Sequence, residues 1–405
     1  MSSIDSMKKL LDGVAVEWLP LGDRTNYEQP TKYLVAAKNY SDDFKTPVLT
    51  AGKTFVLGYS DEPHGIYKAS ESPVIIFDDF TTANKWVDFD FKAKSSAMKM
   101  ITSSDEDKTL LKYIYYWLNT LPSELVDGDH KRQWIGNFSN KRIPIPCSEN
   151  PKKSLEIQGE IVRILDNFTE LTAELTAELT ARKKQYNCYR DQLLSFGEGD
   201  VEWRTLGEIC NFTYGYVAKA QDSGDTRFVR ITDINTDGKL IAANSKYVDL
   251  SKENEKFLLK KSDLLMARTG ATYGKTMIFE EDYPAIYAGF LIKLSLDEAV
   301  INPKFYWHFA QSDFFWDQAN KLVSGGGQPQ FNANVLKEVT MPIPYSSDPE
   351  RSLAEQARIV AILDKFDVLT SSLTEGLPRE IALRQKQYEY YRDLLLSFPR
   401  EQVNA

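Results

Sequence analysis

Two clusters of residues in this sequence have the side-chain chemistry of a nucleic-acid contact. In the first cluster, lysines and serines interleave with Trp86, Phe89 and Phe91, and the stretch His130-Lys-Arg-Gln-Trp follows later. Lysines and small hydroxyls can anchor phosphates, whereas Arg, Gln and Asn can read base edges through paired hydrogen bonds. The candidate contacts of this cluster are Lys85, Lys92, Lys94, Ser95, Ser96, Lys99, Lys131 and Arg132.

The second cluster combines a glycine-rich stretch with a later amide-rich one. The first stretch reads Ala267-Arg-Thr-Gly-Ala-Thr-Tyr-Gly-Lys, and the second reads Ser324-Gly-Gly-Gly-Gln-Pro-Gln-Phe-Asn. Glycines allow a backbone to approach another molecule closely. The candidate contacts of this cluster are Arg268, Thr269, Thr272, Tyr273, Lys275, Gln328 and Gln330.

Motifs of catalysis are scarce. Gly270-Ala-Thr-Tyr-Gly-Lys-Thr resembles a phosphate loop, but three residues separate its glycines where four are needed. The sequence has no Gly-x-Ser-x-Gly, no His-Glu-x-x-His and no Asn-Pro-Pro-Tyr tetrapeptide of amino-methyltransferases. Adjacent acids such as Asp78-Asp79 are more typical of a turn than of an acid/base pair. We therefore expect a chain that is not an enzyme.

Length and composition narrow the class further. A chain of 405 residues is long enough for two or three domains, and it contains no apolar run of 18 residues or more. Its three cysteines and three histidines are scattered, so neither a zinc site nor a disulfide framework is expected, and the predicted location is the cytoplasm. The formal charge of −9 argues against a free-standing nucleic-acid binder, which is usually basic.

The elements that must position the two clusters are duplicated. Residues 143–168 reappear at 341–366 with 14 of 26 positions identical, and 182–196 reappear at 384–398 with 11 of 15 identical. A duplicated unit predicts a pseudo-twofold object. Each repeated stretch carries apolar residues at heptad spacing, beginning at Ile157 and Ile359, which predicts two long helices packed as an antiparallel coiled coil.

The ends and the middle of these helices have their own signals. Ser352 with Glu355 predicts a capping box at the start of the second helix, and Gly376 with Pro378 can kink it. The first helix carries a tandem Thr-Ala-Glu-Leu tetrad at 172–179, where the heptad spacing changes. We interpret the helices as a rigid spacer.

The remaining segments read as two globular heads of mixed α and β structure. Both open on Val-Glu-Trp, at Val16 and Val201, and both close on Pro-Ile-Pro, with almost no sequence shared between these marks. The chain reads as a circle cut before the first head, so its termini are expected to lie close together. The predicted division is 1–14 as an N-terminal segment, 15–150 as head one, 151–199 as the central helix and spacer, 200–348 as head two, 349–398 as the C-terminal helix, and 399–405 as a tail.

This layout resembles the specificity subunit of type I restriction–modification enzymes over essentially the whole chain. The resemblance rests on Gln158 and Gln356, the Ile-Val-x-Ile-Leu-Asp runs at 161 and 359, and the Arg-Asp pairs at 190 and 392. The tetrads resemble those of the branch whose spacer carries tandem copies of Thr-Ala-Glu-Leu. The stretch Arg268-Thr-Gly-x-Thr-x-Gly-Lys resembles a loop recurrent in the target recognition domains of this family.

The resemblance implies an α+β fold with two target recognition domains separated by two long helices. It implies that each head binds one half of a split, asymmetric DNA sequence, without a cofactor of its own. Two modification subunits that use S-adenosylmethionine, and restriction subunits that use ATP and magnesium, are the implied protein partners. The residues expected to form the partner-binding helices are Ile161, Ile164, Phe168, Tyr186, Arg190, Ile359, Ile362, Phe366, Tyr388 and Arg392.

An alternative interpretation is a two-headed coiled-coil adaptor that binds proteins instead of DNA. The acidic net charge favours this adaptor. The duplicated frame with one candidate nucleic-acid cluster in each half favours the DNA-binding subunit. Neither the target sequence nor its gap length is legible from the residues.

Overall fold

The structure, a computed structural model, divides into two compact units. Unit 1 combines residues 1–174 with 382–405, and unit 2 spans 175–381, so each unit holds one head and parts of the long helices. The residues that the structure describes are 11–36, 40–52, 54–122, 132–197, 199, 201–323, 329–372 and 374–398.

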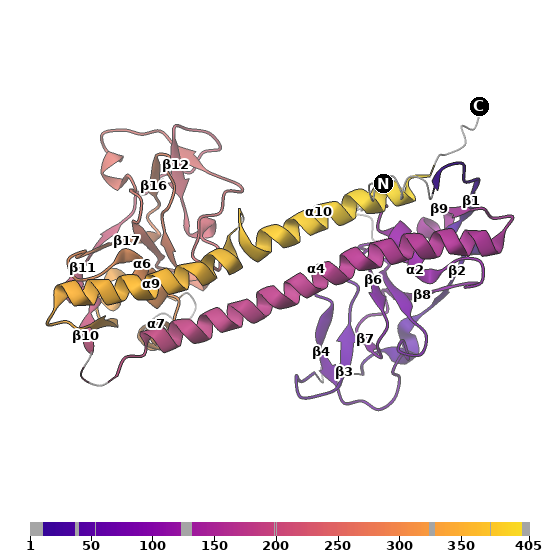
Figure 1. The fold of residues 1–405 in the computed structure, drawn as a ribbon, viewed down its shortest axis with the longest axis horizontal. Helices are drawn as coiled ribbons and strands as arrows, with labels where there is room; N and C mark the ends of the chain where they lie inside the picture. The colour runs from indigo at the N-terminus through magenta and orange to yellow at the C-terminus, as the bar shows by residue number, and fades with distance from the viewer. Residues whose placement is uncertain are drawn as a thin grey trace. The chain divides into compact units, whose positions relative to one another are not determined.

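Each unit has a head that contains β-sheets (Figure 1), and the sheets of the two heads have the same topology. Unit 1 has a four-stranded sheet in the order β2-β8-β5-β6, and unit 2 has one in the order β11-β17-β14-β15. Each unit also has a three-stranded sheet, β4-β3-β7 or β13-β12-β16, with one antiparallel and one parallel pairing. The duplication therefore extends through the heads, where the sequence comparison detected almost none.

The elements of unit 1 lie mainly before the first long helix. They are β1 (Val16–Pro20), β2 (Thr25–Glu28), β3 (Thr46–Leu49), β4 (Val56–Ser60), β5 (Val74–Asp78), β6 (Asn84–Val87), β7 (Lys92–Ala93), β8 (Met98–Ser103), α2 (Leu111–Leu118), α3 (Gln133–Gly136) and β9 (Arg142–Pro146). Three short 3₁₀ helices are η1 (Leu21–Asp23), η2 (Pro30–Tyr33) and η3 (Phe138–Asn140).

Unit 2 repeats this order with additional helices. Its elements are β10 (Val201–Thr205), α5 (Leu206–Ile209), β11 (Cys210–Tyr214), β12 (Thr226–Val229), β13 (Tyr247–Val248), β14 (Leu264–Ala267), β15 (Thr276–Ile278), β16 (Ala285–Tyr287), β17 (Leu291–Leu296), α6 (Pro303–Phe309), α7 (Asp313–Leu322), α8 (Ala333–Leu336) and β18 (Thr340–Pro344). Its 3₁₀ helices are η4 (Ile231–Asp233), η5 (Glu255–Phe257) and η6 (Gly270–Thr272).

The opening and closing motifs of each head form a strand pair. In unit 1, β1 pairs antiparallel with β9 and places Val16 opposite Pro146. In unit 2, β10 pairs with β18 and places Val201 opposite Pro344. The two-stranded sheet therefore joins the two ends of each head, and a long helix begins shortly after its second strand.

Short apolar runs supply the inner strands. β5 has the sequence Val-Ile-Ile-Phe-Asp with its first four residues buried, and all four residues of β14 are buried. A continuous apolar run is what a strand covered on both faces requires. The four residues of β12 are also all buried.

The long helical segments differ from each other. The first is one helix, α4 (Pro151–Leu194), whereas the second is divided into α9 (Pro349–Ser371) and α10 (Gly376–Leu396). The expectation of one continuous helix over 349–398 is therefore wrong, but the division lies at Gly376, where a kink was predicted. Gly376 has φ +74°, a left-handed conformation that interrupts the helical backbone and suits glycine.

The start of α9 also differs from the prediction. Its N-cap is Asp348, whose side chain accepts a hydrogen bond from the Arg351 backbone N at 3.1 Å. Ser352 lies inside the first turn and is buried, so it is not the capping residue. The predicted capping box of Ser352 with Glu355 is wrong because the helix begins earlier.

Aromatic stacking pairs the long helices within each unit. In unit 1, Phe168 of α4 stacks on Tyr391 of α10 with centroids 5.1 Å apart. In unit 2, Tyr189 of α4 stacks on Phe366 of α9 at 5.4 Å. Each stack joins the first repeated block of one copy to the second repeated block of the other, as a circular arrangement requires.

The described ends of the chain meet in one hydrophobic core. Leu11 packs against the cluster in unit 1 that contains Ile161, Leu395 and Phe398. The expected proximity of the chain ends is therefore seen at the first and last residues that the structure describes.

A buried glutamine fixes each head to its long helix. The Gln158 side chain accepts from Leu110 N and donates to Lys108 O, both at 3.0 Å. The Gln356 side chain likewise accepts from Asn302 N and donates to Val300 O, both at 2.9 Å. Because the two glutamines are fully buried, these hydrogen bonds satisfy backbone groups that water cannot reach.

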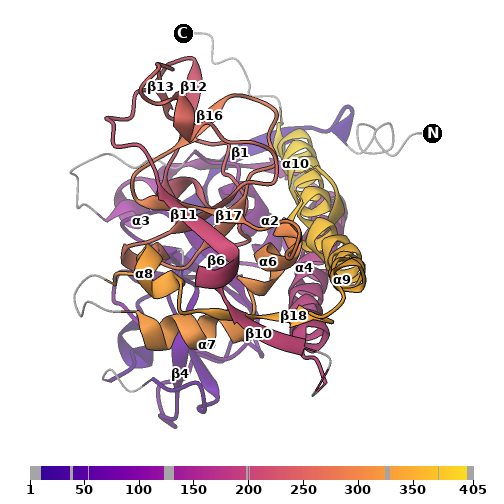
Figure 2. The ribbon, with the colours of Figure 1, turned by 90° about the vertical axis from the view of Figure 1, so that its left-hand side faces the viewer.

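The glutamines hold the start of an equivalent helix in each head. In unit 1, Leu110 is the N-cap of α2, and in unit 2, Asn302 is the N-cap of α6. α6 packs against α9 (Figure 2). The head residues bonded in unit 1 lie 192 positions before the equivalent residues of unit 2. The two glutamines lie 198 positions apart.

Replacing Gln356 by Leu is expected to destabilise unit 2. The change leaves the Asn302 N–H and the Val300 carbonyl buried without partners, which costs about 2–4 kcal/mol in the free energy of unfolding. Chemical unfolding of the full chain measures the change, and Gln192→Leu on the exposed side of α4 is the matched control. A loss of unfolding free energy equal to that of the control would contradict the structural role of Gln356.

Candidate nucleic-acid interface

Corresponding loops follow the buried inner strand of each four-stranded sheet. We define them as tip loop 1 (79–83, after β5) and tip loop 2 (268–275, after β14). In both, the first carbonyl accepts a backbone hydrogen bond at 2.8 Å, from Gln133 N to Asp79 O and from Phe331 N to Arg268 O. The tip loops are thus anchored in the same way but carry different residues.

Four predicted contacts of unit 1 are exposed near tip loop 1. Lys94, Ser95 and Ser96 form an exposed turn before β8, and the next carbonyl, of Ala97, accepts from Asp79 N at 2.9 Å. Arg132 is also exposed, with Nη1 at 4.0 Å from Asp79 Oδ2. The structure therefore brings these four side chains to one part of the head.

Two other predicted contacts of unit 1 have separate positions. Lys85 is exposed on β6 and lines a hollow of about 320 Å³ together with Thr81 and Thr82 of tip loop 1. Lys131 lies outside the described residues.

Lys92 and Lys99 must be removed from the predicted contact set. Lys92 is 2 % exposed, and its Nζ donates to His64 O at 2.6 Å and pairs with Glu62 at 2.9 Å. Lys99 is fully buried and pairs with Asp79 at 3.1 Å. A buried ammonium group needs such partners, because an unpaired buried charge is very costly. Both lysines are therefore paired inside the head and cannot reach a phosphate.

In unit 2, the predicted residues of tip loop 2 point in different ways. Arg268 is half-buried at the beginning of the loop, whereas Thr269 is buried and pairs through its backbone with Gln330. The Tyr273 hydroxyl donates to Asn320 Oδ1 at 2.7 Å. The prediction that the Thr269 side chain contacts DNA is contradicted by its burial.

Three further predicted contacts of unit 2 are Thr272, Lys275 and Gln328. Thr272 is half-buried and donates to the Thr269 carbonyl at 3.4 Å. Lys275 lines a cavity of about 270 Å³ beside Lys183 and Asn187 of α4, away from the start of the loop. Gln328 lies outside the described residues.

Glycines make the tight path of tip loop 2 possible. Gly270 and Gly274 have φ of +69° and +75°. A Cβ atom at Gly274 would also lie 2.9 Å from the Trp316 ring, so a larger residue would clash. Two of the glycines noted in the sequence are therefore backbone requirements of this loop.

The predicted partner-binding residues of the helices lie mostly inside the chain. Ile161, Ile164, Tyr186, Arg190 and Ile359 are buried against the heads or the neighbouring helix. Those five are therefore corrected: their apolar or stacking surface is used within this chain. The partly exposed members of the set are Phe168, Ile362, Phe366, Tyr388 and Arg392.

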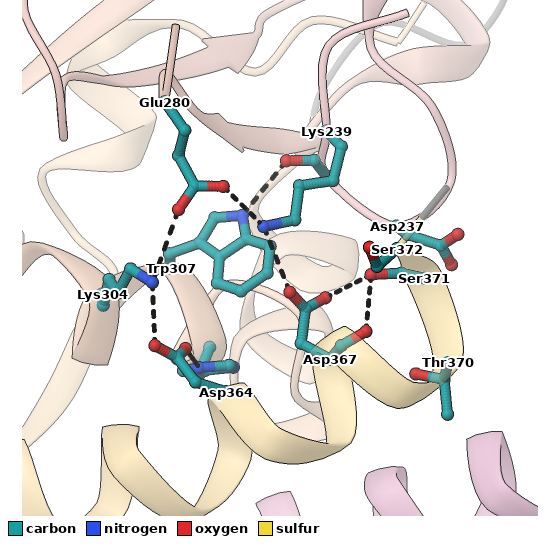
Figure 3. A network of polar contacts seen from close by, with 12 residues as sticks. Asp237, Lys239, Glu280, Lys304, Trp307, Asp364, Asp367, Thr370, Ser371 and Ser372 are labelled. Atoms are coloured by element: carbon teal, nitrogen blue, oxygen red, sulfur yellow. Dashed lines mark hydrogen bonds and ion pairs between the residues drawn. The ribbon is translucent and has the colours of Figure 1, made fainter. Parts of the chain in front are cut away.

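In unit 2, a polar network joins the head to α9 (Figure 3). Lys304 lies between Asp364 at 2.8 Å and Glu280 at 3.4 Å. Lys239 pairs with Glu280 at 2.9 Å and with Asp367 at 3.1 Å, and its Nζ lies 4.3 Å from the centre of the Trp307 ring. Alternating charges of this kind orient the head on the helix.

His308 is the buried end of this network. Its Nε2 lies 2.9 Å from Asp364 Oδ1, and its Nδ1 lies 2.8 Å from the Tyr186 hydroxyl. A carboxylate only accepts, so Nε2 carries the proton and Nδ1 accepts from Tyr186. Burial lowers the pKa of His308 below its usual 6.5, although the bond to Asp364 opposes this shift.

Competing effects shift the pKa values of Asp364, which bonds His308, and of Lys304, which pairs with Asp364. Burial alone would raise the pKa of Asp364, but the hydrogen bonds from His308 and Lys304 outweigh it and lower that pKa. Burial alone would lower the pKa of Lys304, but the bond to Asp364 raises it. Both groups are therefore held in their charged forms.

Unit 1 has a matching network with different residue types. Lys112 pairs with Asp166 at 2.9 Å, as Lys304 pairs with Asp364. The Tyr116 hydroxyl donates to Asp166 Oδ1 at 2.5 Å, at the position that His308 has in unit 2. Burial raises the pKa of Tyr116, so this donor stays protonated.

Sequence reasoning missed a group of exposed aromatic and apolar residues near the tip loops. Phe80 in tip loop 1 is 43 % exposed, and Tyr214, Val217 and Phe290 of unit 2 are 43 %, 86 % and 54 % exposed. Large contiguous apolar patches mark interaction sites, whereas single exposed apolar side chains are common on protein surfaces. Single aromatic residues in a divergent head gave no repeated spacing by which to find them.

Neither a metal-ligating cluster nor a membrane-spanning helix is found in the part of the chain that the structure describes. There, no group of three or more His, Cys, Asp or Glu side chains is placed to hold a metal ion. None of the helices so described is long and apolar enough to cross a membrane.

Two similar heads on a duplicated frame with long helices define a two-headed recognition protein. The sequence matches the type I restriction modification DNA specificity domain twice, over residues 21–182 and 198–383. This chain belongs to that family and is a specificity subunit of a type I restriction–modification system. A specificity subunit contributes recognition of DNA and is not the catalytic component.

Individual relatives agree with this assignment. The chain is 54 % identical to the Escherichia coli type I restriction enzyme EcoR124I/EcoR124II specificity subunit, covering 100 % of this chain and 99 % of the relative. It is 31 % identical to the Escherichia coli EcoprrI specificity subunit, covering 93 % of both. The crystal structure of the type I S subunit from M. genitalium has the same fold, with a TM-score of 0.57, 16 % identity, and coverage of 96 % of this chain and 98 % of that one.

The His308 site predicts a pH dependence of stability. Because the folded pKa is lowered, its contribution is complete above about pH 6.5 and is lost as the pH falls toward the folded pKa. The apparent unfolding temperature of unit 2 should fall from about pH 7.5 to about pH 5.5, and should fall less in His308→Gln. Thermal unfolding of both proteins, with exchange of α6 amides as the local probe, measures this. Equal falls in the two proteins would contradict the assignment.

Proposed function

We propose that each head of this specificity subunit reads one half of a split, asymmetric DNA sequence. The single observation that carries the proposal is that the same frame occurs twice with different tip-loop residues. Arg268 begins tip loop 2, whereas Asp79 begins tip loop 1 and is buried. Two readers of one fold with different chemistry suit a target with two unlike halves.

The residues proposed to contact DNA are the predicted ones of each head whose side chains are exposed or half-buried. In unit 1 they are Lys85, Lys94, Ser95, Ser96 and Arg132, which can bind phosphates or base edges. In unit 2 the main candidate is Arg268, with Thr272, Tyr273, Lys275 and Gln330 as further members of the set. Lys131 and Gln328 remain predictions.

We further propose that the subunit assembles with two copies of one modification subunit and, through them, with restriction subunits. Support comes from surface features that occur in both copies of the repeat. Arg182 Nη1 donates to Gln185 Oε1 at 2.8 Å, and at the equivalent position Arg384 Nη1 donates to Gln387 Oε1 at 3.0 Å. A surface present twice suits a partner bound twice.

The partners also account for the acidic charge. A net charge of −9 is unfavourable for a protein that grips DNA alone, but partner subunits that enclose the duplex can supply phosphate contacts. S-adenosylmethionine would belong to the modification subunit, and ATP with magnesium to the restriction subunit. The place of action is then the cytoplasm, where the DNA is.

Binding by the assembled complex tests the proposal. The complex should prefer one bipartite duplex over unrelated DNA by about 4–10 kcal/mol, with affinity that falls as salt rises. Competition binding at two salt concentrations measures both quantities. A complex that binds all duplexes alike would favour the alternative of a protein-binding adaptor.

The tetrads of α4 are proposed to set the gap between the half-sites. A tetrad adds about 6 Å along a helix, and one base pair rises about 3.4 Å. Deleting 176–179 should therefore shorten the tolerated gap, as measured by methylation of a library of gap lengths. Replacing the same four residues with alanines keeps the length and is the control. An unchanged gap in the deletion variant would refute this role.

A further inference from the structure

We propose that Arg268 reads a guanine in the second half of the DNA target, and that Tyr214 and Phe290 position its guanidinium. This inference rests on the proposed function and goes further, because it assigns one base to one side chain. It also adds two positioning residues that the sequence did not single out.

The backbone of Arg268 is fixed on both sides. Its N–H donates to Phe290 O at 3.1 Å, and its carbonyl accepts from Phe331 N at 2.8 Å. The preceding residue, Ala267, is fully buried at the end of β14. The Cα–Cβ direction of Arg268 is therefore set by the sheet and does not depend on a loose loop.

The guanidinium is held by one hydrogen bond and two aromatic rings. Nε donates to Gly289 O at 3.1 Å. The Cζ atom lies 5.2 Å from the centre of the Tyr214 ring and 5.6 Å from that of Phe290, within cation–π range. The Tyr214 ring is itself anchored, because its hydroxyl accepts from Ala333 N at 3.1 Å. These contacts restrict rotation of the long side chain.

The outer edge of the same guanidinium has no protein acceptor in the described parts of the chain. Its two Nη groups make no hydrogen bond or ion pair there. The hollow beside them, of about 410 Å³, is lined largely by apolar residues such as Val217 and Phe228. Arg230 lines the same hollow but is paired with Asp233 at 2.7 Å, so it is already committed.

A fixed guanidinium whose outer pair of donors is bonded by no described residue matches one base in particular. In the major groove, guanine presents N7 and O6 as adjacent acceptors, and a bidentate arginine bonds both. Lysine cannot reproduce this geometry because its charge is a single point with rotating donors. A phosphate contact would need neither the fixed orientation nor the two rings.

The equivalent position in unit 1 cannot do this. Asp79 is fully buried there, pairs with Lys99, and accepts from Trp134 N at 2.9 Å. The guanine contact is thus confined to the half-site read by unit 2. This difference at one shared position is a physical source of asymmetry in the target.

Methylome sequencing tests the assignment with the full chain expressed beside its modification subunit. The wild type should methylate a motif with a fixed guanine in one half-site. Arg268→Ala and Arg268→Lys should both lose the preference at that one position, by roughly 5- to 150-fold, and leave the other half-site unchanged. Lys261→Ala, which removes an exposed cation of unit 2, is the matched control and should keep the motif.

Several outcomes would overturn the assignment. Retention of every fixed base in both Arg268 variants would do so, as would a uniform loss of methylation that Arg268→Lys restores, because the latter indicates a phosphate contact. A wild-type motif with two half-sites but no guanine in either would refute the assignment of Arg268 to a guanine and leave the proposed function intact. A wild type without any bipartite motif would refute the proposed function itself.

If a complex that contains an Arg268 variant methylates DNA poorly, its DNA affinity can still be measured. Each guanine of the target is replaced in turn by 7-deazaguanine, which lacks the N7 acceptor. The wild-type complex should lose affinity at one guanine, and Arg268→Lys should lose nothing further there. Additive losses at every guanine would contradict a direct contact.

The two rings are tested by variants that keep or remove them. Phe290→Ala should weaken the preference at the same guanine alone, whereas Phe290→Tyr should retain it because the ring remains. Phe290 is largely exposed, so a folding defect is not expected from either change. Equal preference in the Ala and Tyr variants would remove Phe290 as a positioning residue.

Discussion

Each head of this protein depends on a buried glutamine that joins it to the neighbouring long helix. Gln158 and Gln356 each bond one backbone N–H and one backbone carbonyl at the beginning of a head helix. The contact fixes where the head helix begins and therefore how its sheets are oriented on the long helix. Since each glutamine bonds backbone groups, the contact depends on the backbone conformation of the head and not on particular side chains.

That property explains how much of the fold could be predicted. The repeated blocks lie in the helices and the edge strands, where Gln356, Asp364 and Phe366 have counterparts at a constant offset, so duplication was legible. The heads keep the same topology with different residues, and only Lys112 and Lys304 are identical between α2 and α6. Packing at these positions requires an apolar side chain of suitable size and not one particular residue. The duplication of the heads was therefore not visible in the sequence.

The candidate site divides in the same way. The residue types near the tip loops were predicted, yet Lys92 and Lys99 are buried and paired with acids, which a count of lysines cannot reveal. Burial depends on the partner that the fold brings near, such as Glu62 or Asp79, and those partners are distant in sequence. Phe290 and Tyr214 were missed for the same reason, because they meet Arg268 only after the strands have paired.

The meeting of Leu11 with Leu395 and Phe398 in one core has an evolutionary consequence. Where a chain closes on itself, the gene has no privileged starting point, and either head can be encoded first. The repeated stretches that bracket the second head are also matching tracts at which homologous recombination can act. An exchanged head would bring a new half-specificity and would dock without any change to the scaffold that receives it.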